Sequence, residues 1–443
     1  MLARLEALWE QVISGLWLIP TLMALTAVGL AWLTPYLPLD SDEPSLIWWL
    51  GSGDPESVGQ FISALLTSMI TLATLAISIT MVVLTLAASQ MGPRLIRNFM
   101  ADKRTQLMLG SFLSTVIYLI LAMRAVQHAG EGDNFHHLAA TISMLLSIGS
   151  VFLLLLFVHH LSRSIIADTL IQRIGKSLYY TLDEALPAGS HEDGQDQEAR
   201  LPEDEAAALS LSEGGYVEAI DYDQLKKCAA EADVLIYLDF RPGQFLLPGG
   251  NHGQIFPASH GSARLQEKIE NCVAFGGQRT PQQDLEFAVR QLVEIALRAL
   301  SPSVNDPFTA IAVIDHLSLF LAEVMRREPA RSIWHDDQSK PRVIATTIRF
   351  RGLVDTALNQ IRQAGQRPDI LIHMMDALIQ LAEQARKPRH REVLRDHVEL
   401  VLTDGQRCIE DPYDLAPLEA RAREALGLLS QPDHHISPLP KSF

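Results

Sequence analysis

The chain has 443 residues, with 36 Lys and Arg against 52 Asp and Glu, a net charge of −16, and 20% charged residues. That fraction is below the roughly 25% of an average soluble domain, and long apolar runs take up the difference, so the chain is not simply a soluble enzyme. Nucleic acid is excluded as an expected partner, because a chain of this charge offers phosphates no basic groove. The composition therefore predicts a membrane protein in contact with the lipid bilayer.

Four apolar runs reach or approach the ~20 residues that a helix needs to cross the hydrocarbon core of a bilayer. They are Val12–Leu33, Phe61–Ala88, Leu107–Met123 and Leu138–Val158. The first run is too long for the core of a signal peptide, so we expect an uncleaved span. The sequence thus predicts a four-span transmembrane domain over residues 1–160.

The basic residues near the ends of these runs predict the orientation, because positively charged loops remain in the cytoplasm. The loop before the second run carries several acidic residues and no basic one, whereas the loop after it carries Arg94, Arg97, Lys103 and Arg104. We therefore expect both termini of this multi-pass protein in the cytoplasm.

The second run predicts one long helix from Pro55 to about Ser89, with Asp54 as its N-cap. On a helical wheel of about 100° per residue, most Ser and Thr side chains of this helix lie within an arc of about 80°. Counting backwards, a glutamine and a glutamate continue the arc at the outer end. We call these residues the polar stripe: Glu56, Gln60, Ser63, Thr67, Thr71, Thr74, Ser78, Thr85 and Ser89.

Two interpretations of the polar stripe remain open. Small hydroxyl side chains let membrane helices approach closely and hydrogen-bond across their contact. Alternatively, copies of this helix around a symmetry axis present the stripe to water and line a conduit, with Glu56 as an outer ring that attracts cations. Hydroxyl groups alone do not identify the permeant ion.

The second half of the chain changes character several times. A juxtamembrane helix is predicted over residues 161–185, an acidic linker over 186–212, a small α+β module over 213–261, a helical cytoplasmic domain over 262–430 and a loose tail over 431–443. In the module, Gly215–Ile220 and Val234–Phe240 predict strands, and Asp221 caps a helix over Tyr222–Ala232.

The helical domain is predicted from capping signals and periodicity. Thr280–Gln283 is a capping box that opens a helix over Pro281–Leu300, and Asp306 with Pro307 caps the next one. Further helices are predicted over Val343–Ala364, Asp369–Ala385, Arg391–Cys408 and Leu415–Leu429. The expected fold class is a mainly α membrane protein with four transmembrane helices, a small α+β module and an all-α region.

We predict no metal site and no cofactor. The three cysteines lie far apart in the sequence, so neither a disulfide framework nor a zinc site is indicated. His128, His136 and His137 lie near one outer loop, but their spacing is not that of ligands on a helix. The glycines after Pro248 are not followed by the lysine of a phosphate-binding loop.

The segment Arg279–Ala310 reads RTPQQDLEFAVRQLVEIALRALSPSVNDPFTA and resembles the signature of a family of bacterial inner-membrane proteins catalogued as a domain of unknown function. The segments ASQMGPRLIRNFM, GYVEAID and RPGQF are similar to other parts of that family, so the resemblance covers nearly the whole chain. Ser303 and Val304 depart from it, because the family pattern has Gly and Ile there. The resemblance implies a protein of the bacterial inner membrane with a cytoplasmic domain, and it brings no activity with it.

The signature also has a physical interpretation. Its polar residues are expected at a helix-to-helix corner and on or near the preceding helix: Ser301, Asn305, Asp306 and Pro307 at the corner, and Arg279, Asp284, Glu286 and Arg290 before it. Either this is a structural corner with an internal ion pair, or it binds a ligand or a regulatory ion. No arrangement of His or Cys nucleophiles lies nearby, so we predict no catalytic residue.

Two functions from different classes follow. The first is a homo-oligomeric ion channel or pore, lined by the second run and gated by the cytoplasmic domain. The alternative is a membrane-anchored sensor or scaffold without transport activity. An enzyme is not expected, because no constellation of catalytic residues supports one.

Overall fold

The computed structural model describes residues 17–36, 55–91, 102–128, 135–164, 167–185, 201–281, 283–327 and 332–430. Tertiary contacts divide the chain into two compact units. We call Leu8–Thr169 the apolar unit and the part from Leu170 onward the mixed unit. The predicted cap Asp54, the basic residues Arg94 and Arg97, much of the acidic linker and the tail lie outside the described residues.

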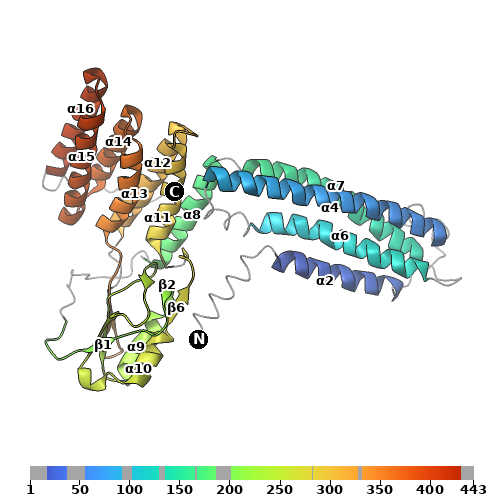
Figure 1. The fold of residues 1–443 in the computed structure, drawn as a ribbon, viewed down its shortest axis with the longest axis horizontal. Coiled ribbons are helices and arrows are strands. Elements are labelled where there is room, and N and C mark those ends of the chain that lie inside the picture. The colour runs from blue at the N-terminus through green and yellow to red at the C-terminus, as the bar shows by residue number, and fades with distance from the viewer. Residues whose placement is uncertain are drawn as a thin grey trace. The chain divides into compact units, whose positions relative to one another are not determined.

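The described part of the apolar unit is a bundle of long helices (Figure 1): α2 (Leu18–Leu33), α4 (Pro55–Met91), α6 (Lys103–Gln127) and α7 (Phe135–Ser164). A 3-10 turn, η1 (Thr34–Tyr36), follows α2. Helix α6 packs against the other three, and α4 also packs against α7. Gly110 of α6 permits its close approach to α2, because a Cβ there would lie 3.0 Å from the Cα of Pro20.

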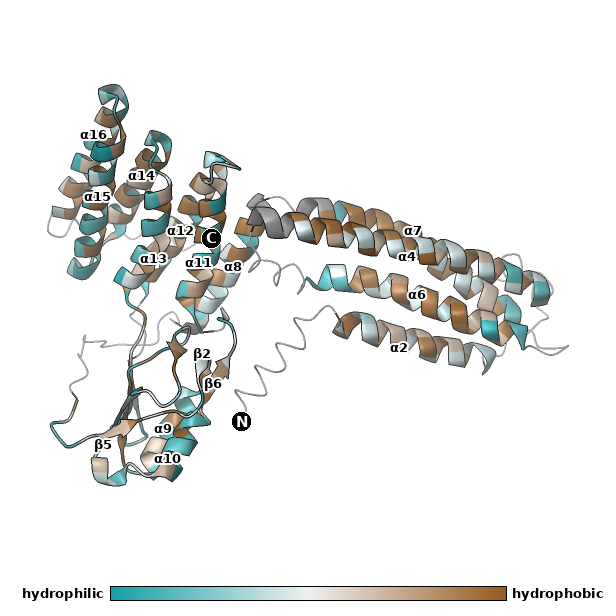
Figure 2. Cartoon of the chain, in the orientation of Figure 1, coloured by the Kyte–Doolittle hydropathy of each residue, from teal (hydrophilic) through white to brown (hydrophobic). Residues whose placement is uncertain are grey.

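Helix α4 starts at Pro55, as the sequence predicts, and ends two residues beyond the predicted Ser89. Its 37 residues give a length of roughly 55 Å, which exceeds the ~30 Å hydrocarbon core of a bilayer. Figure 2 shows that hydrophobic residues predominate along α4 and α7.

Among the described residues, five helices are long and apolar enough to cross a membrane. Four of them, α2, α4, α6 and α7, coincide with the predicted runs, and the fifth is α12 (Pro307–Arg326) in the mixed unit. The predicted number of four spans is therefore not confirmed. Of the apolar window in α12, 50% is buried within the protein, against 17% to 39% in the other four helices.

The mixed unit contains two small sheets. The first has the order β1-β5-β3-β8-β7 and the second β4-β2-β6. Strands β3 and β8 are parallel, and the other pairs are antiparallel. The strand bounds are β1 (Ala207–Leu209), β2 (Gly215–Ile220), β3 (Leu235–Leu238), β4 (Phe245–Leu246), β5 (Gly253–Phe256), β6 (Val273–Gly276), β7 (Ile333–His335) and β8 (Pro341–Ala345).

Both sheets share one hydrophobic core with two short helices, α9 (Tyr222–Glu231) and α10 (Ala263–Glu270). Ile236 and Val343 of the first sheet and Val273 of the second are fully buried in it. The 3-10 turn η3 (Ala258–His260) precedes α10. Asp221 caps α9 by accepting a hydrogen bond from the Gln224 amide, which confirms that predicted cap.

Some strands lie where the sequence predicts other structure. Strand β1 falls within the predicted linker, and β6, β7 and β8 fall within the region predicted to be all helical. The predicted helix Val343–Ala364 is wrong at its start, because Pro341–Ala345 is a strand and the helix begins at Phe350. The short apolar run Val343–Ala345 fits either structure by periodicity, and its parallel pairing with β3 decides between them.

The remaining helices of the mixed unit form three stacked hairpins: α11 (Leu285–Ala299) with α12, α13 (Phe350–Ala364) with α14 (Pro368–Gln384), and α15 (Pro388–Cys408) with α16 (Pro412–Ser430). Helix α11 packs on α13 and α13 on α15, while α12 packs on α14 and α14 on α16, so the hairpins form two layers. Proline opens α12, α14, α15 and α16, where its missing N–H costs nothing.

Helix α8 (Ala167–Ala185) lies within the predicted juxtamembrane helix, and the two residues between it and the end of α7 lie outside the described part of the chain. Within the mixed unit, α8 buries a stripe of aliphatic side chains, Ile171, Ile174, Leu178 and Leu182. Asp183 forms an ion pair of 2.7 Å with Arg327 at the end of α12.

Candidate functional site

The polar stripe lies on the side of α4 that faces away from its own bundle. At about 100° per residue, the buried residues Ile62, Met69 and Ala76 centre about 180° from the stripe. Every described stripe side chain except the half-buried Ser63 is exposed within the single chain, and the side chain of Ser89 lies outside the described residues. Thr80, which falls outside the stripe, is 7% exposed. Most of the stripe is thus exposed within the protomer, and its first residues, from Glu56 to Thr67, border an open groove beside the end of α6.

The threonines of the stripe satisfy their own hydroxyl donors. Each donates to the carbonyl oxygen four residues earlier, at 2.8 to 3.0 Å, in Thr67, Thr71, Thr74 and Thr85. This bond lowers the cost of placing a hydroxyl in an apolar environment, because the donor is not left unpaired. The same bond occurs at Ser68, outside the stripe.

Two polar contacts within the apolar unit join α6 to α7. The hydroxyls of Thr115 on α6 and Ser150 on α7 lie 3.1 Å apart in a buried position. Nε2 of His160, near the end of α7, lies 2.5 Å from Oδ2 of Asp102, which also caps α6. This His160–Asp102 pair was not predicted, although an aspartate before the third run is a residue type that caps helices.

In the signature segment, Arg279 and Asp284 form a buried ion pair. The Arg279 Nε and guanidinium nitrogens lie 2.7 and 2.6 Å from Asp284 Oδ2, and the Asp284 side chain is 1% exposed. Asp284 also caps α11 by accepting from the Phe287 amide at 3.0 Å. Burial raises the pKa of the Asp284 carboxyl above its ordinary value, and the nearby guanidinium only partly offsets this effect.

Two other segments that resemble the family meet this ion pair. Gly243, in the RPGQF segment, adopts φ +89°, and a Cβ there would lie 2.0 Å from Asp284 Oδ2. Arg241 of the same segment forms an ion pair of 2.8 Å with Glu286. The Gln283 side chain accepts from the Ile220 amide at the end of GYVEAID. The predicted capping box at Thr280 is therefore wrong, because Asp284 caps the helix four residues later and Gln283 binds a strand instead.

The corner residues lie at the opposite end of α11, so the structure does not bring the predicted signature residues together. Asn305 has φ +50°, a conformation that asparagine tolerates better than most residues, and accepts from Arg367 at 2.7 Å. Asp306 caps α12 through the Thr309 amide and hydroxyl, which confirms the predicted cap with Pro307. Ser301 donates to the Arg298 carbonyl.

These contacts favour a structural role for the signature corner. The internal ion pair that the sequence analysis expected does exist, but it fixes the start of α11 and not the corner. Arg290 is exposed on α11 and takes no part in either group. Val304 and Phe308 at the corner are 50% and 79% exposed.

A second buried polar group joins α13 to α15 and was not predicted. His397 is 1% exposed, and its Nε2 lies 3.0 Å from Asp355 Oδ1. About two turns along each helix, the buried Arg362 pairs with Asp404. Within the described residues, His397 Nδ1, Asn359 Oδ1 and Arg362 Nε have no hydrogen-bond partner. Burial lowers the pKa of His397 despite the adjacent Asp355.

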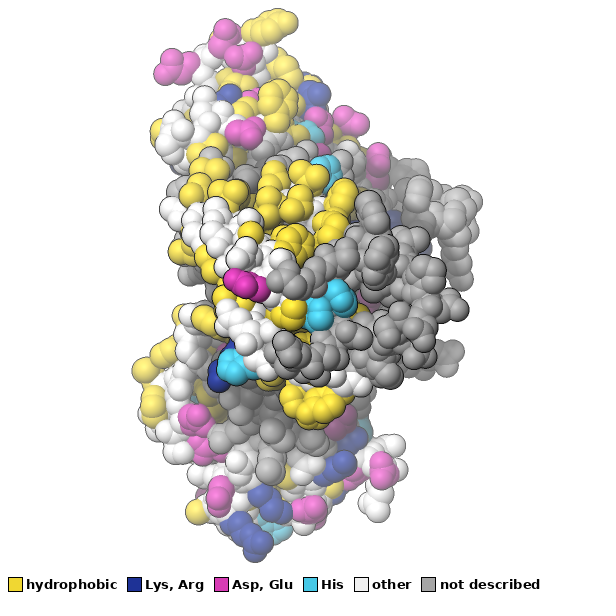
Figure 3. All heavy atoms as spheres, turned by 90° about the vertical axis from the view of Figure 1, so that its right-hand side faces the viewer, with side chains coloured by type: hydrophobic (Ala, Val, Ile, Leu, Met, Phe, Trp, Pro, Cys, Tyr) yellow, Lys and Arg dark blue, Asp and Glu magenta, His cyan; other side chains and the backbone are white. Residues whose placement is uncertain are grey.

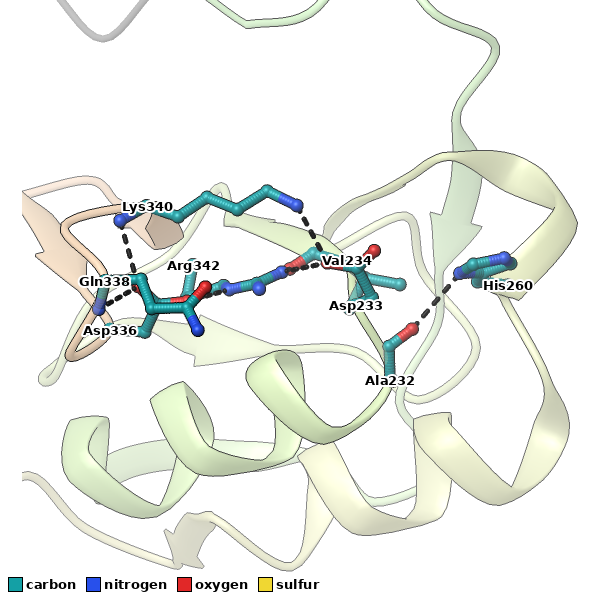
Figure 4. A network of polar contacts seen from close by, with 8 residues as sticks. All are labelled: Ala232, Asp233, Val234, His260, Asp336, Gln338, Lys340 and Arg342. Carbon is teal, nitrogen blue, oxygen red and sulfur yellow. Dashed lines mark hydrogen bonds and ion pairs between the residues drawn. The ribbon is translucent and has the colours of Figure 1, made fainter.

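A third network fixes the β7–β8 hairpin to the turn after α9 (Figure 4). The Arg342 side chain is 7% exposed and pairs with Asp336 and Asp233 at 2.7 Å each. Lys340 also binds Asp233, and these two hydrogen bonds lower the pKa of Asp233 to about 2. Asp233 has φ +49°, so the network holds an unusual backbone conformation in place.

The cysteines show no sign of reactivity. Cys228 and Cys272 lie in the same core of the mixed unit, and all three cysteines, including Cys408, are free. Burial raises the pKa of Cys272 to about 12, whereas a reactive thiol needs a lowered pKa. Among the described residues, no three His, Cys, Asp or Glu side chains form a group that could hold a metal ion.

Several helices long and apolar enough to cross a bilayer are the features of a membrane protein. Residues 14–380 match the family described as "Predicted membrane protein (DUF2254)", and the chain belongs to that family. This confirms the resemblance noted in the sequence.

Similar curated proteins are themselves uncharacterised. The chain is 29% identical over 452 residues to uncharacterized protein Mb1321c of Mycobacterium bovis, covering 100% of this chain and 86% of the relative. The same values hold for uncharacterized protein Rv1290c of Mycobacterium tuberculosis. No solved structure matches the chain.

Proposed function

We propose that the protein is a homo-oligomeric ion channel or pore, in which copies of α4 surround a water-filled axis and the mixed unit gates the opening. The observation that carries this proposal is the orientation of the polar stripe, which faces away from the bundle of its own chain. In a lone protomer this side of α4 would place a row of hydroxyl groups against acyl chains. In a ring of protomers the same side meets other copies or water.

The proposed topology has four spans, with both termini and the mixed unit in the cytoplasm of a bacterial inner membrane. Helix α12 is assigned to the mixed unit, because Val313, Leu317 and Phe320 are fully buried there and α12 packs between α11 and α14. The orientation follows from the basic residues after the second run.

The test is ion flux through the full chain reconstituted in liposomes, under voltage and under osmotic downshock. We expect the triple variant Thr71→Leu, Thr74→Leu, Ser78→Leu to lose flux while its assembly in mild detergent is unchanged. Ser68→Leu is the matched control, because Ser68 is exposed and bonded like the stripe threonines but lies outside the stripe. Absence of flux in the wild type, or equal loss in the control, contradicts the proposal.

Labelling of introduced cysteines is a second test of the direction in which the polar stripe faces. In an assembled conduit, a charged thiol reagent should block Thr71→Cys and leave Ser68→Cys conducting. Cys228 and Cys272 are buried and Cys408 is partly exposed, so wild-type protein treated with the same reagent reports the background from the native cysteines. Equal labelling of both positions from the lipid side would contradict a conduit lined by the stripe.

The alternative is a membrane-anchored scaffold, and the stacked hairpins α11 to α16 favour it. Stacked helix pairs of this kind form extended surfaces that bind partner proteins. A scaffold requires no ring of subunits, so a wild type that is monomeric in mild detergent and passes no ions would support this alternative over the channel.

A further inference from the structure

An open groove lies where the start of α4 meets the end of α6. Its volume is about 720 Å³, which falls within the 300–1,000 Å³ typical of small-molecule sites. The space-filling view in Figure 3 faces the end of the apolar unit where α4 starts, and that surface is a mixture of hydrophobic and polar side chains. The lining residues are Pro55, Glu56, Gly59, Gln60, Ser63, Ala64, Thr67, Met123, Val126 and Gln127. We call this the α4–α6 groove.

The polar part of the lining can bind a cation. Glu56 is the one charged residue among the ten that line the groove, and none of them is basic. The side-chain oxygens of Gln60 and Gln127 are further acceptors in the same wall. The nearest basic residues along α6, Arg124 and His128, do not line the groove, and the His128 ring bonds to the Arg124 carbonyl.

The helix end does not reverse this preference. The N-terminus of a helix carries roughly half a positive charge, which is unfavourable for a cation. Glu56 lies in the first turn of α4, so its carboxyl group stands at the helix end and supplies a counter-charge for a cation there. A carboxylate and neutral acceptors, without a basic neighbour in the lining, favour a ligand with hydrogen-bond donors and a positive charge.

The apolar part of the lining calls for hydrocarbon next to that charge. Met123 and Val126 of α6 and Pro55 and Ala64 of α4 are apolar members of the lining. Gly59 leaves open space, because a Cβ added there would meet no atom within 4 Å. An inorganic cation would leave this apolar wall unused.

We propose that the α4–α6 groove binds an organic ammonium group, with its nitrogen at Glu56 and its hydrocarbon against Met123 and Val126. Two sources share this chemistry, the amine headgroup of a lipid and a free alkyl or aryl ammonium. The site includes the outer residues of the polar stripe but does not rest on the proposed function, since binding requires neither flux nor a conduit.

The experiment measures binding to the full chain in nanodiscs. Phenethylammonium is titrated by calorimetry into nanodiscs of phosphatidylcholine and phosphatidylglycerol, with phenethyl alcohol as the uncharged analogue. In a parallel arm, native mass spectrometry counts phosphatidylethanolamine and phosphatidylglycerol retained by the protein. Saturable binding in the first arm identifies a free amine, selective retention of the ethanolamine lipid identifies a headgroup, and either result supports the site.

The variants separate charge from shape. Glu56→Gln should weaken ammonium binding by about tenfold or more, the loss of one charge-assisted contact, and Glu56→Asp should restore most of it. Gly59→Leu fills the groove and should also weaken binding. Gly149→Leu is the control, because that α7 glycine likewise has open space but does not line the groove.

Several outcomes would overturn the proposal. They are the absence of binding in both arms, equal binding of phenethyl alcohol, wild-type affinity in Glu56→Gln, and equal losses in Gly59→Leu and Gly149→Leu. Binding in a protein that passes no ions would remove the channel and leave this site standing.

Discussion

The buried Arg279–Asp284 pair predicts a sharp loss of stability when only one of its charges is removed. Asp284→Asn keeps the size of the side chain and its capping role, because asparagine caps helices about as well as aspartate. It removes the negative charge that lies 2.6 Å from the guanidinium of Arg279. Arg279 then remains, 18% exposed, with its nearest carboxylate oxygen on Glu286 at 3.9 Å.

The magnitude follows from the burial of the pair. Leaving one charge of a buried pair uncompensated costs about 3–5 kcal/mol. The partial compensation by Glu286 places the expected cost near the lower end, about 3 kcal/mol. In the double variant Arg279→Met, Asp284→Asn no buried charge is left, so most of that loss should be recovered.

Hydrogen exchange of the full chain in detergent, measured by mass spectrometry at increasing urea, checks this prediction. The opening free energy of peptides from α11 and from β2, which lie near the Arg279–Asp284 pair, should be lower in the single variant than in the double variant. Asp396→Asn is the control, because Asp396 and Arg351 form an ion pair of 2.6 Å that is 44% and 45% exposed. Such an exposed pair contributes about 1 kcal/mol or less.

The reasoning is refuted if Asp284→Asn and Asp396→Asn change the opening free energy equally. It is also refuted if the double variant is as unstable as the single one, since the cost would then not come from an unpaired charge.

The remaining predictions concern the backbone and pH. Gly243→Ala should lower the stability of the folded state by about 3 kcal/mol or more, because the added Cβ would meet the carboxylate of the ion pair. Gly249→Ala, with φ +74° and no atom within 4 Å of the added Cβ, should lower it by only about 1–2 kcal/mol. Thermal unfolding of the two variants measures the difference. At the corner, Asn305→Gly should be tolerated, and Asn305→Ala should cost about 1–2 kcal/mol because φ is +50°. Burial lowers the pKa of His397, so its contribution to stability is full above the unfolded value of about 6.5 and falls as the pH drops below it. The opening free energy of α13 and α15, obtained from hydrogen exchange after correction for the slower intrinsic exchange at low pH, should therefore fall from pH 7 to pH 5 in the wild type and less so in His397→Gln. An equal fall in that variant would count against this assignment.

Local signals in the sequence predicted the long elements well. Apolar runs of about 20 residues predict a helix without knowledge of the rest of the fold, because a membrane helix makes its backbone hydrogen bonds within itself. These runs located α2, α4, α6 and α7. The cap at Asp306 and the start of α4 at Pro55 likewise depend on adjacent residues. The outward orientation of the stripe followed from helical periodicity once the buried side of α4 was known.

Contacts distant in sequence explain what could not be predicted. Strand β8 exists because it pairs with β3, more than a hundred residues earlier. The Asp284 cap outcompetes the capping box at Thr280 because Arg279 binds it and Gln283 is engaged by Ile220. The signature residues were expected close together, but they lie at opposite ends of α11. The 15 residues of this helix place its two ends roughly 22 Å apart. The buried polar group around His397 joins residues of α13 and α15, and these two helices share no sequence pattern.

The hydrogen bonds inside α4 have a consequence for what could pass along it. Each threonine proton at Thr67, Thr71, Thr74 and Thr85 is committed to a carbonyl of the same helix. At these four positions the hydroxyl oxygen offers lone pairs to a cation or a water molecule and keeps no free proton for an anion, whereas the amide of Gln60 in the same stripe retains donors. If α4 lines a passage, as proposed above, these four positions would favour cations over anions.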